Sequence, residues 1–342
     1  MKTQLELFLS SCRDGVFRHV RAYLEKRTAP LPPAMRACVK DYPYRRGKAL
    51  RPALALLFAR AYGGRPGPAL KVASAYQLLE DWGLGRDDIL DGGQLRRGLP
   101  ALHLRYGLPR ALNALDMLHD CVFDMLYVYC RLPAGEYGRV RAIFAEATEV
   151  TLGGQHLDIE AREIPLEKFT PGAYLRIAER KTAFYTVTVP CLLGAELAGA
   201  RGQSAAIREF GRLLGAAFQI TDDVLDAEND GTGLFGKAPG NDILEGKRTL
   251  VALEAFRRLP PAAARRLARL YSLPPAAKSA AAVAAARRAI LASGAPAACR
   301  ARAQALTAAA AAVFEKSLLP AMRPPGGRLI AEFIQALGRR TF

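Results

Sequence analysis

The sequence lacks the cysteine and histidine patterns that mark disulfide-rich domains, zinc sites and di-iron sites. Its six cysteines include no CxxC pair and lie in largely apolar surroundings, so we expect buried, reduced thiols. Histidine is scarce, and none of the four has a glutamate three residues before it, which disfavours a di-iron carboxylate bundle.

Long hydrophobic runs are also missing. The longest uncharged stretch, Thr182–Ala195, is too short to span a bilayer and contains a proline. The first residues carry a lysine and a glutamate within a short apolar run, which is not the pattern of a signal peptide. We therefore expect a soluble, cytoplasmic protein with no transmembrane segment.

Acidic residues are outnumbered by basic ones, 32 to 49, and the formal net charge is +17. Such a charge suggests nucleic acid first, and an anionic membrane or an anionic substrate next. The basic residues are scattered, however, and no RNP-like, zinc-finger or glycine-rich phosphate-loop signature is present. Nucleic acid is therefore disfavoured as a partner.

Alternating, strand-like runs are nearly absent, and helical periodicity dominates. The best strand candidate, Phe184–Val189, lies inside a longer helical pattern. Apolar residues three and four apart predict helices over Leu50–Tyr62, Leu70–Leu84, Ala111–Cys130, Tyr137–Leu152, Ala173–Leu197 and Ala205–Leu225. Proline and glycine predict breaks at Gly63–Pro66, Leu132–Pro133, Ile164–Pro165, Thr170–Gly172 and Gly231–Gly240.

The helical pattern predicts a single all-α domain over residues 1–342. Its core would span about residues 44–250, and alanine-rich outer helices would follow over about residues 260–340. The segment Pro260–Phe314 is low in complexity, but arginine and leucine recur in it at helical spacing. We therefore expect two or three outer helices there, and not a linker.

Two acidic clusters share the spacing Asp-Asp-x-x-Asp: Asp87, Asp88 and Asp91, then Asp222, Asp223 and Asp226. Residues four apart share a helix face, so the outer aspartates of each cluster should point together while the apolar residues between them turn toward the core. Three carboxylates on one turn repel one another, and at a helix C-terminus they also oppose the helix dipole. Magnesium, a hard ion that binds carboxylates and substrate phosphates, would neutralise such a turn.

Basic residues accompany both clusters: Lys48, Arg51, Arg96, Arg97, Lys181, Lys237 and Lys247. Acidic clusters with nearby arginine and lysine form a holder for a metal-bridged diphosphate. Taken singly, one acidic cluster is also typical of a solvated helix face, and one basic residue of a surface charge. The repeated spacing in apolar surroundings favours the functional interpretation.

The chain resembles the trans-isoprenyl diphosphate synthases, also called polyprenyl synthetases, in six motifs that stand in the family's order. They are GKALRP (Gly47–Pro52), DDILD with RRG downstream (Asp87–Gly98), GGQHLD (Gly153–Asp158), RKT (Arg180–Thr182), FQITDDVLD (Phe218–Asp226) and GKAPGNDILEGKRT (Gly236–Thr249). The resemblance implies a single-domain antiparallel helix bundle around a deep central cavity, assembled as a homodimer.

The resemblance also implies site roles. The catalytic residues would be Asp87, Asp88, Asp91, Lys181, Asp222 and Asp223, and both clusters, including Asp226, would bind three magnesium ions. The allylic diphosphate would contact Arg96, Lys181, Thr182, Gln219, Lys237 and Lys247. Isopentenyl diphosphate would contact Lys48, Arg51 and Arg97. Gln155 and Asp158 match a motif on the cavity wall, with helix packing as the alternative.

The implied reaction is the magnesium-dependent, head-to-tail condensation of isopentenyl diphosphate with an allylic diphosphate. Trp82 would form the floor that stops chain growth, with the small Gly83 beside it, which favours geranylgeranyl diphosphate as product and farnesyl diphosphate next. The alternative for Trp82 is a core or dimer-interface residue.

The sequence departs from the family pattern at Glu80, where relatives usually carry histidine or glutamine, and Asp81 follows it. A carboxylate facing a diphosphate is unfavourable unless it is protonated, turned away or paired with an arginine. Either Glu80 pairs locally or the acceptor site is altered. Gly83 and Gly85 weaken the helix before the first cluster, which allows a bend or a close approach to substrate.

Two other functions stay open at the level of the sequence. A terpene cyclase of related fold would also use an aspartate cluster and magnesium, but its second metal motif differs from the second cluster found here. A non-catalytic regulatory subunit of a heteromeric synthase usually loses aspartates, and both clusters are complete in this chain. Glu80 is the feature that favours such a subunit.

Overall fold

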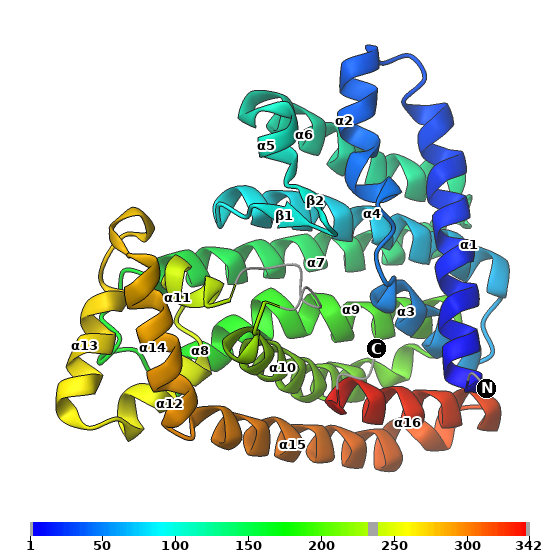
Figure 1. The fold of residues 1–342 in the computed structure, drawn as a ribbon. Helices are drawn as coiled ribbons and strands as arrows, with labels where there is room; N and C mark the ends of the chain where they lie inside the picture. The colour runs from blue at the N-terminus through cyan, green and yellow to red at the C-terminus, as the bar shows by residue number, and fades with distance from the viewer. Residues whose placement is uncertain (1–2, 232–238, 340–342) are drawn as a thin grey trace. The chain divides into compact units, whose positions relative to one another are not determined.

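The structure, a computed structural model, describes residues 3–231 and 239–339. Helices make up most of these ranges (Figure 1). The elements in chain order are α1 (Gln4–Arg27), α2 (Pro33–Tyr44), α3 (Leu50–Ala61), α4 (Pro66–Leu90), β1 (Leu95–Arg96), β2 (Leu99–Pro100), α5 (Leu102–Tyr106), α6 (Leu108–Asp124), η1 (Met125–Tyr129), α7 (Ala134–Ala161), α8 (Pro171–Ile177), η2 (Ala178–Thr188), α9 (Val189–Leu197), η3 (Arg201–Gln203), α10 (Ser204–Glu228), α11 (Asn241–Glu245), α12 (Leu250–Arg258), α13 (Pro261–Tyr271), η4 (Pro275–Ala277), α14 (Ala280–Ala292), α15 (Ala295–Val313), η5 (Phe314–Leu318), η6 (Leu319–Ala321) and α16 (Pro324–Arg339).

The predicted all-α fold is confirmed. Each segment with helical periodicity is helical, and the predicted segment 173–197 lies in one run made of α8, the π-helix η2 and α9. The strand candidate 184–189 lies in that run. The sequence did not predict the short hairpin of β1 and β2, in which Leu95 pairs with Pro100 and Arg96 with Leu99.

The chain forms two compact units. Unit 1 contains Met1–Glu146, Val189–Ile207 and Ser317–Phe333, and unit 2 contains Ala147–Thr188, Arg208–Lys316 and Ile334–Phe342. The first acidic cluster belongs to unit 1 and the second to unit 2. A single domain over residues 1–342 stays a prediction, as does a central cavity.

Unit 1 is built on α3 and α4. Helix α3 packs against α4 and α9, and α4 also packs against α1 and α6. The approach of α9 to α3 requires a glycine, because a Cβ on Gly194 would lie 2.5 Å from the carbonyl oxygen of Ala55. This close packing buries Phe58 and Leu78 completely and fixes α4, the helix that leads to the first cluster.

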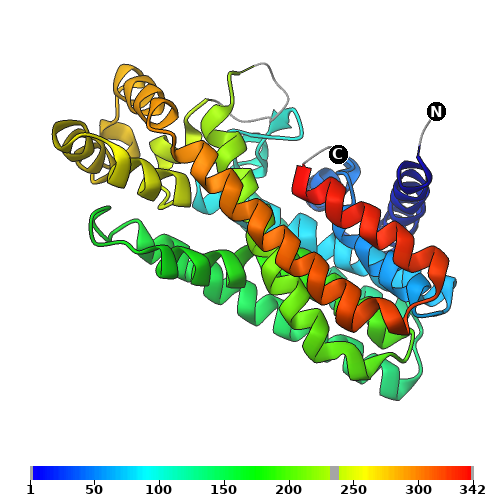
Figure 2. The same cartoon turned by 90° about the horizontal axis from the view of Figure 1, so that it is seen from below.

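Unit 2 is built on α12, which packs against α8, α13, α14 and α15. The alanine-rich segment Pro260–Phe314 contains α13, α14 and α15, which confirms that it is helical and not a linker. Figure 2 shows α12, α13 and α14 gathered at the N-terminal end of α15. The apolar core of unit 2 includes Tyr174, Ile220, Val224 and Leu250, so the helix that carries the second cluster is anchored in it.

All six cysteines are buried and free, which confirms the prediction of reduced thiols. Within residues 3–231 and 239–339, no helix is both long enough and apolar enough to cross a membrane.

Candidate active site

The first acidic cluster lies where α4 ends. Asp87 and Asp88 belong to its last turn, and Asp91 caps the helix, its backbone N–H donating to the carbonyl of Asp87 at 2.9 Å. Asp87 and Asp91 are half-buried. The prediction that the apolar residues between the aspartates turn toward the core is wrong for Leu90. This side chain is 43% exposed, because the helix ends at this residue.

The middle aspartate of this cluster, Asp88, is an anchor. It is 3% exposed and accepts hydrogen bonds from the guanidinium of Arg96, whose Nε lies 2.9 Å from Oδ2. The hydroxyl of Tyr42 donates to the same oxygen at 2.6 Å. Burial and the bond to Asp88 raise the pKa of Tyr42, so the hydroxyl keeps its proton and donates. Arg96 is therefore held at the cluster, and its contact with the allylic diphosphate stays a prediction.

The hairpin of β1 and β2 places Arg96 beside the cluster because Arg45, at the C-terminal end of α2, holds the hairpin. Arg45 donates to the backbone carbonyls of Arg96 and Pro100, both at 2.8 Å, and pairs with Asp41 at 2.6 Å. The backbone N–H of Leu102 donates to the hydroxyl of Tyr42 at 3.1 Å. Sequence reasoning missed Tyr42, Arg45 and Asp41. Their only signal was their place just before the first motif.

Glu80 pairs locally. Its Oε1 lies 2.8 Å from Nη1 of Arg51. The adjacent Asp81 lies 2.9 Å from Nη2 of Arg97, and this carboxyl is fully buried. Burial raises the pKa of Asp81 to about 6, although Arg97 acts to lower it. Two of the three cations predicted for isopentenyl diphosphate thus already face carboxylates.

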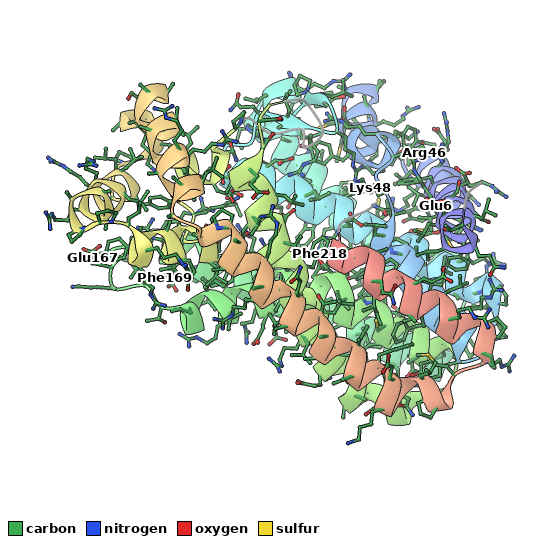
Figure 3. The ribbon with its side chains drawn as sticks, turned by 60° about the horizontal axis from the view of Figure 1, so that its bottom comes forward. Glu6, Arg46, Lys48, Glu167, Phe169 and Phe218 are labelled. Carbon is green, nitrogen blue, oxygen red and sulfur yellow. The ribbon has the colours of Figure 1, made fainter. Side chains whose placement is uncertain are left out.

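The segment between α2 and α3, on which Figure 3 labels Arg46 and Lys48, has an unusual backbone. Arg46 and Ala49 adopt the left-handed conformation, with φ of 51° and 54°, and so does Arg97 on the hairpin, with φ of 52°. Such strained residues cluster at functional sites. A Cβ on Gly47 would lie 2.7 Å from Nη2 of Arg97, so this glycine makes room for the guanidinium. Lys48 is exposed on the same segment.

Trp82 packs against α6. Its ring lies 4.4 Å from that of His119, centroid to centroid, and the guanidinium of Arg86 lies 5.6 Å from the Trp82 ring. A Cβ on Gly85 would lie 2.5 Å from Cδ2 of Leu115, so this glycine allows α6 to approach α4. A chain-length role of Trp82 and Gly83 stays a prediction.

The second cluster lies on the last turns of α10. Its middle aspartate, Asp223, is 6% exposed and accepts from the hydroxyl of Tyr174 at 2.6 Å and from Nε2 of Gln219 at 2.7 Å. Thr182 donates to Gln219 at 2.6 Å, which fixes the amide. Burial raises the pKa of Tyr174, so its hydroxyl is a donor. Gln219 and Thr182 were predicted to contact the allylic diphosphate, which stays a prediction, whereas Tyr174 was missed.

A fourth carboxylate joins the second cluster. Asp242, at the start of α11, donates its backbone N–H to Oδ2 of Asp226 at 3.3 Å. Burial, then the charges of Asp242 and Asp222, raise the pKa of Asp223 well above its ordinary value. A small pocket is lined by Asp223, Asp226, Asp242 and Tyr271 among other residues. The second cluster therefore gathers negative charge that a cation would relieve.

Lys181 lies on the π-helix η2 and is held by α7. Its Nζ is 2.7 Å from Oδ2 of Asp158. Burial acts to raise the pKa of Asp158, but Lys181, Lys247 and Arg162 together outweigh burial and lower this pKa. A Cβ on Gly154 would lie 2.3 Å from the backbone nitrogen of Lys181, so this glycine lets the two helices meet. Asp158 thus positions Lys181, and Gln155, which follows Gly154 in the chain, is buried.

The segment after α10 contains the remaining predicted cations. Lys237 lies outside the described residues. Lys247 pairs with Glu245 at 2.7 Å and lies 3.8 Å from Asp242. The neighbouring Arg248, which sequence reasoning missed, is buried and donates to the carbonyls of Arg162 and Ile164, both at 2.7 Å. Arg248 therefore fixes the loop that presents Lys247.

The two clusters have the same local arrangement. In each, the middle aspartate is buried and bonded to a buried tyrosine, while the outer aspartates are more accessible. No three Asp, Glu, His or Cys side chains in the described ranges form a ready-made metal site. Oxygen donors without a closed cage are the setting in which magnesium binds together with substrate phosphates and water.

Comparison with known proteins agrees with these motifs. The sequence model of the polyprenyl synthetase family matches residues 32–290. A short chain isoprenyl diphosphate synthase of Methanothermobacter thermautotrophicus is 37% identical over 62% of this chain and 64% of its own length, which is just under two thirds. A geranylgeranyl diphosphate synthase of Mycobacterium tuberculosis is 34% identical over 78% of this chain and 75% of its own length.

A solved structure extends the likeness to the whole fold. The geranylgeranyl pyrophosphate synthase of Corynebacterium glutamicum, crystallised with isoprenyl diphosphate and magnesium, has a TM-score of 0.85 and 25% identity, covering 99% of this chain and 100% of that chain. The family match spans both acidic clusters and most of the residues that hold them. By its sequence, its fold and its two tyrosine-anchored aspartate turns, the chain belongs to the polyprenyl synthetase family.

Proposed function

We propose that this chain is a prenyltransferase that condenses isopentenyl diphosphate with an allylic diphosphate to give a short-chain prenyl diphosphate. Geranylgeranyl diphosphate is the favoured product and farnesyl diphosphate the next. The observation that carries the proposal is the pair of DDxxD turns, each fixed through its middle aspartate at the C-terminal end of a long helix. Relatives that are 34–37% identical and are named as synthases of this kind support it.

The donor set fits magnesium. The outer aspartates Asp87, Asp91, Asp222 and Asp226 are hard oxygen donors, and we assign them as the ligands. Asp88 and Asp223 already accept hydrogen bonds, and we assign them to positioning of the turns. When bound, magnesium would supply positive charge that stabilises the departing diphosphate.

The chain's own cations would hold the same diphosphate. Arg96 and Lys181 are each fixed by a carboxylate, Asp88 and Asp158, so they need no reorganisation when charge develops on the leaving group. Thr182, Gln219 and Lys247 complete this proposed set, with Lys237. Lys48, Arg51 and Arg97 would take the diphosphate of the second substrate.

Product length is proposed to depend on Trp82. The indole is 8% exposed and stacked on His119, so it is held rigidly near the end of α4. We expect Trp82→Ala to give longer products in an assay that sizes the prenyl chains. An unchanged product would remove Trp82 from this role.

The reaction itself is tested with the purified chain, magnesium, isopentenyl diphosphate and each allylic diphosphate in turn, followed by product sizing. Condensation products that disappear on magnesium chelation would support the proposal. Turnover of an allylic diphosphate without isopentenyl diphosphate would favour a cyclase. Activity that requires a second, different chain would favour a regulatory subunit.

Assembly and location stay predictions from the sequence. A homodimer is checked by light scattering after size-exclusion chromatography of the purified chain, where a monomeric mass at working concentration would contradict it. A cytoplasmic location is checked by fractionation of the source cells.

A further inference from the structure

The cations proposed for the acceptor diphosphate are already compensated by α4. We call Lys48, Arg51 and Arg97 the acceptor subsite. Glu80 lies 2.8 Å from Arg51 and Asp81 lies 2.9 Å from Arg97, measured between oxygen and nitrogen atoms. The two carboxylates offset two of the three positive charges of the subsite.

Arg97 is fixed in this arrangement. It donates to the carbonyl of Tyr42 at 2.8 Å, lies against Gly47 and has a strained backbone. Asp81 in turn accepts from Nε2 of Gln77 at 3.3 Å, and both of these side chains are fully buried. The Asp81–Arg97 pair is therefore part of the unit 1 core, and a ligand would meet Arg97 with its carboxylate in place.

Glu80 has fewer hydrogen bonds than its neighbour Asp81. Its Oε1 accepts from Arg51, but its Oε2 is buried and has no hydrogen-bond partner in the structure. A buried carboxylate oxygen without a partner costs stability, so packing alone does not explain why glutamate stands here. A glutamine would have kept the shape and removed the charge.

We propose that Glu80 lowers the affinity of the acceptor subsite for the diphosphate group of its ligands. This inference rests on the proposed function. It assigns to Glu80 an effect on how tightly the same site binds its ligands. An incoming diphosphate must share Arg51 with Glu80 or displace it, and in either case it meets the negative charge of Glu80. The subsite therefore binds an anion tightly only when the isopentenyl tail adds apolar contacts, which disfavours inorganic pyrophosphate, a product of the reaction.

Calorimetry without magnesium favours binding at this subsite, because the aspartate turns then lack the ion that would bridge them to phosphate. Inorganic pyrophosphate and isopentenyl diphosphate are titrated separately into the wild type and into Glu80→Gln. We expect Kd to fall about tenfold for both ligands in the variant, because Glu80 acts on the diphosphate that they share.

Glu196→Gln is the matched control. Glu196 lies 2.6 Å from Arg139, and its side chain is 9% exposed against 10% for Glu80, but it lies on α9 outside the subsite. Its Kd values should equal those of the wild type. Steady-state assays add a second readout: in Glu80→Gln, KM should fall for isopentenyl diphosphate and stay constant for the allylic substrate.

The possible outcomes separate the two proposals. Unchanged or weaker binding of both anions by Glu80→Gln would overturn the role of Glu80, even if the wild type condenses its substrates. Tighter pyrophosphate binding would support it even if the wild type shows no condensation. Should Glu80→Gln fail to fold, Asp81→Asn removes the neighbouring negative charge instead. It should lower Kd for both ligands, and a Kd that stays constant or rises would overturn the inference.

Discussion

Tyr42 and Tyr174 hold the two acidic clusters in the same way, although they lie far apart in the sequence. Each is a buried tyrosine whose hydroxyl donates at 2.6 Å to the middle aspartate of an acidic turn. A hydrogen bond to a carboxylate is stronger than one between neutral groups, and it is stronger still in a buried setting. The bond offsets part of the repulsion within the turn and fixes the direction in which the outer aspartates point.

The tyrosine anchors are tested by Tyr174→Phe. Loss of the hydroxyl leaves an oxygen of Asp223 short of a donor, so we expect a loss of about 1–2 kcal/mol in the free energy of unfolding. We expect kcat to fall about tenfold because the turn is no longer held in place. Denaturant titration and steady-state kinetics measure the two effects.

Tyr62→Phe is the control for the tyrosine prediction. The hydroxyl of Tyr62 is buried and has no hydrogen-bond partner in the structure, so its removal should cost neither stability nor rate. If Tyr174→Phe behaves like this control, the hydroxyl of Tyr174 is not an anchor.

Asp81 should make stability depend on pH. Burial raises its pKa to about 6 from an ordinary value of 3.8, so the folded state binds this proton more tightly than the unfolded state. The stabilisation is complete below about pH 4 and is lost as the pH rises through 6. The loss is up to about 3 kcal/mol at pH 7.

Asp81→Asn removes this titration. The stability of the variant relative to wild type should therefore rise from pH 4 to pH 7, by up to about 3 kcal/mol, in urea unfolding followed by circular dichroism. Parallel stability curves for the two proteins over this range would contradict a raised pKa of Asp81.

At the scale of elements, the contact between α7 and η2 positions Lys181. A π-helix places its side chains differently from an α-helix, and such segments are frequent at functional sites. Gly154 removes the side chain that would otherwise collide with the η2 backbone, and Asp158, one turn later, then reaches Lys181 at 2.7 Å. The motif GGQHLD is therefore explained by helix packing that serves the site.

Gly154→Ala should separate these two elements. The added Cβ would lie 2.3 Å from a backbone nitrogen, which cannot move as a side-chain end can, so we expect a loss of about 2–3 kcal/mol in unfolding free energy. We also expect kcat to fall, since Lys181 loses its position.

Gly138→Ala is the matched control on the same helix. Its Cβ meets nothing within 4 Å, so the change should be neutral or stabilise the helix by up to about 1 kcal/mol. Equal stabilities for the two alanine variants would show that the contact between α7 and η2 is not tight.

At the scale of the whole molecule, the acidic turns are regions of local negative charge in a chain of net charge +17. Relief of that charge by a bound cation should stabilise the fold by mass action. Magnesium and pyrophosphate added together should therefore raise Tm by several degrees, more than the sum of their separate effects, since each ligand supplies binding contacts for the other.

Differential scanning fluorimetry with and without a chelator checks this coupling. Asp222→Asn should reduce the joint shift in Tm, while leaving the effect of salt alone unchanged. A purely additive response of the wild type to magnesium and pyrophosphate would contradict binding of a magnesium–diphosphate complex.

Much of the fold followed from the sequence. Helical periodicity located α3, α4, α6, α7 and α10, because an apolar stripe at helical spacing stabilises a helix whatever it packs against. The hairpin of β1 and β2 could not be predicted in this way. Two-residue strands carry no periodicity, and this hairpin is clamped by Arg45, which lies some fifty residues earlier in the chain.

By itself, the sequence determined the helical class and the family, since local spacing and composition suffice for these, and it predicted the acidic and basic residues of the proposed site. The tertiary structure alone decided which of those charges are already paired. It placed Tyr42 on Asp88, Tyr174 on Asp223 and Glu80 on Arg51. The physical reason is that an ion pair or a buried hydrogen bond joins side chains far apart in the chain, and only packing of the helices brings them within 3 Å.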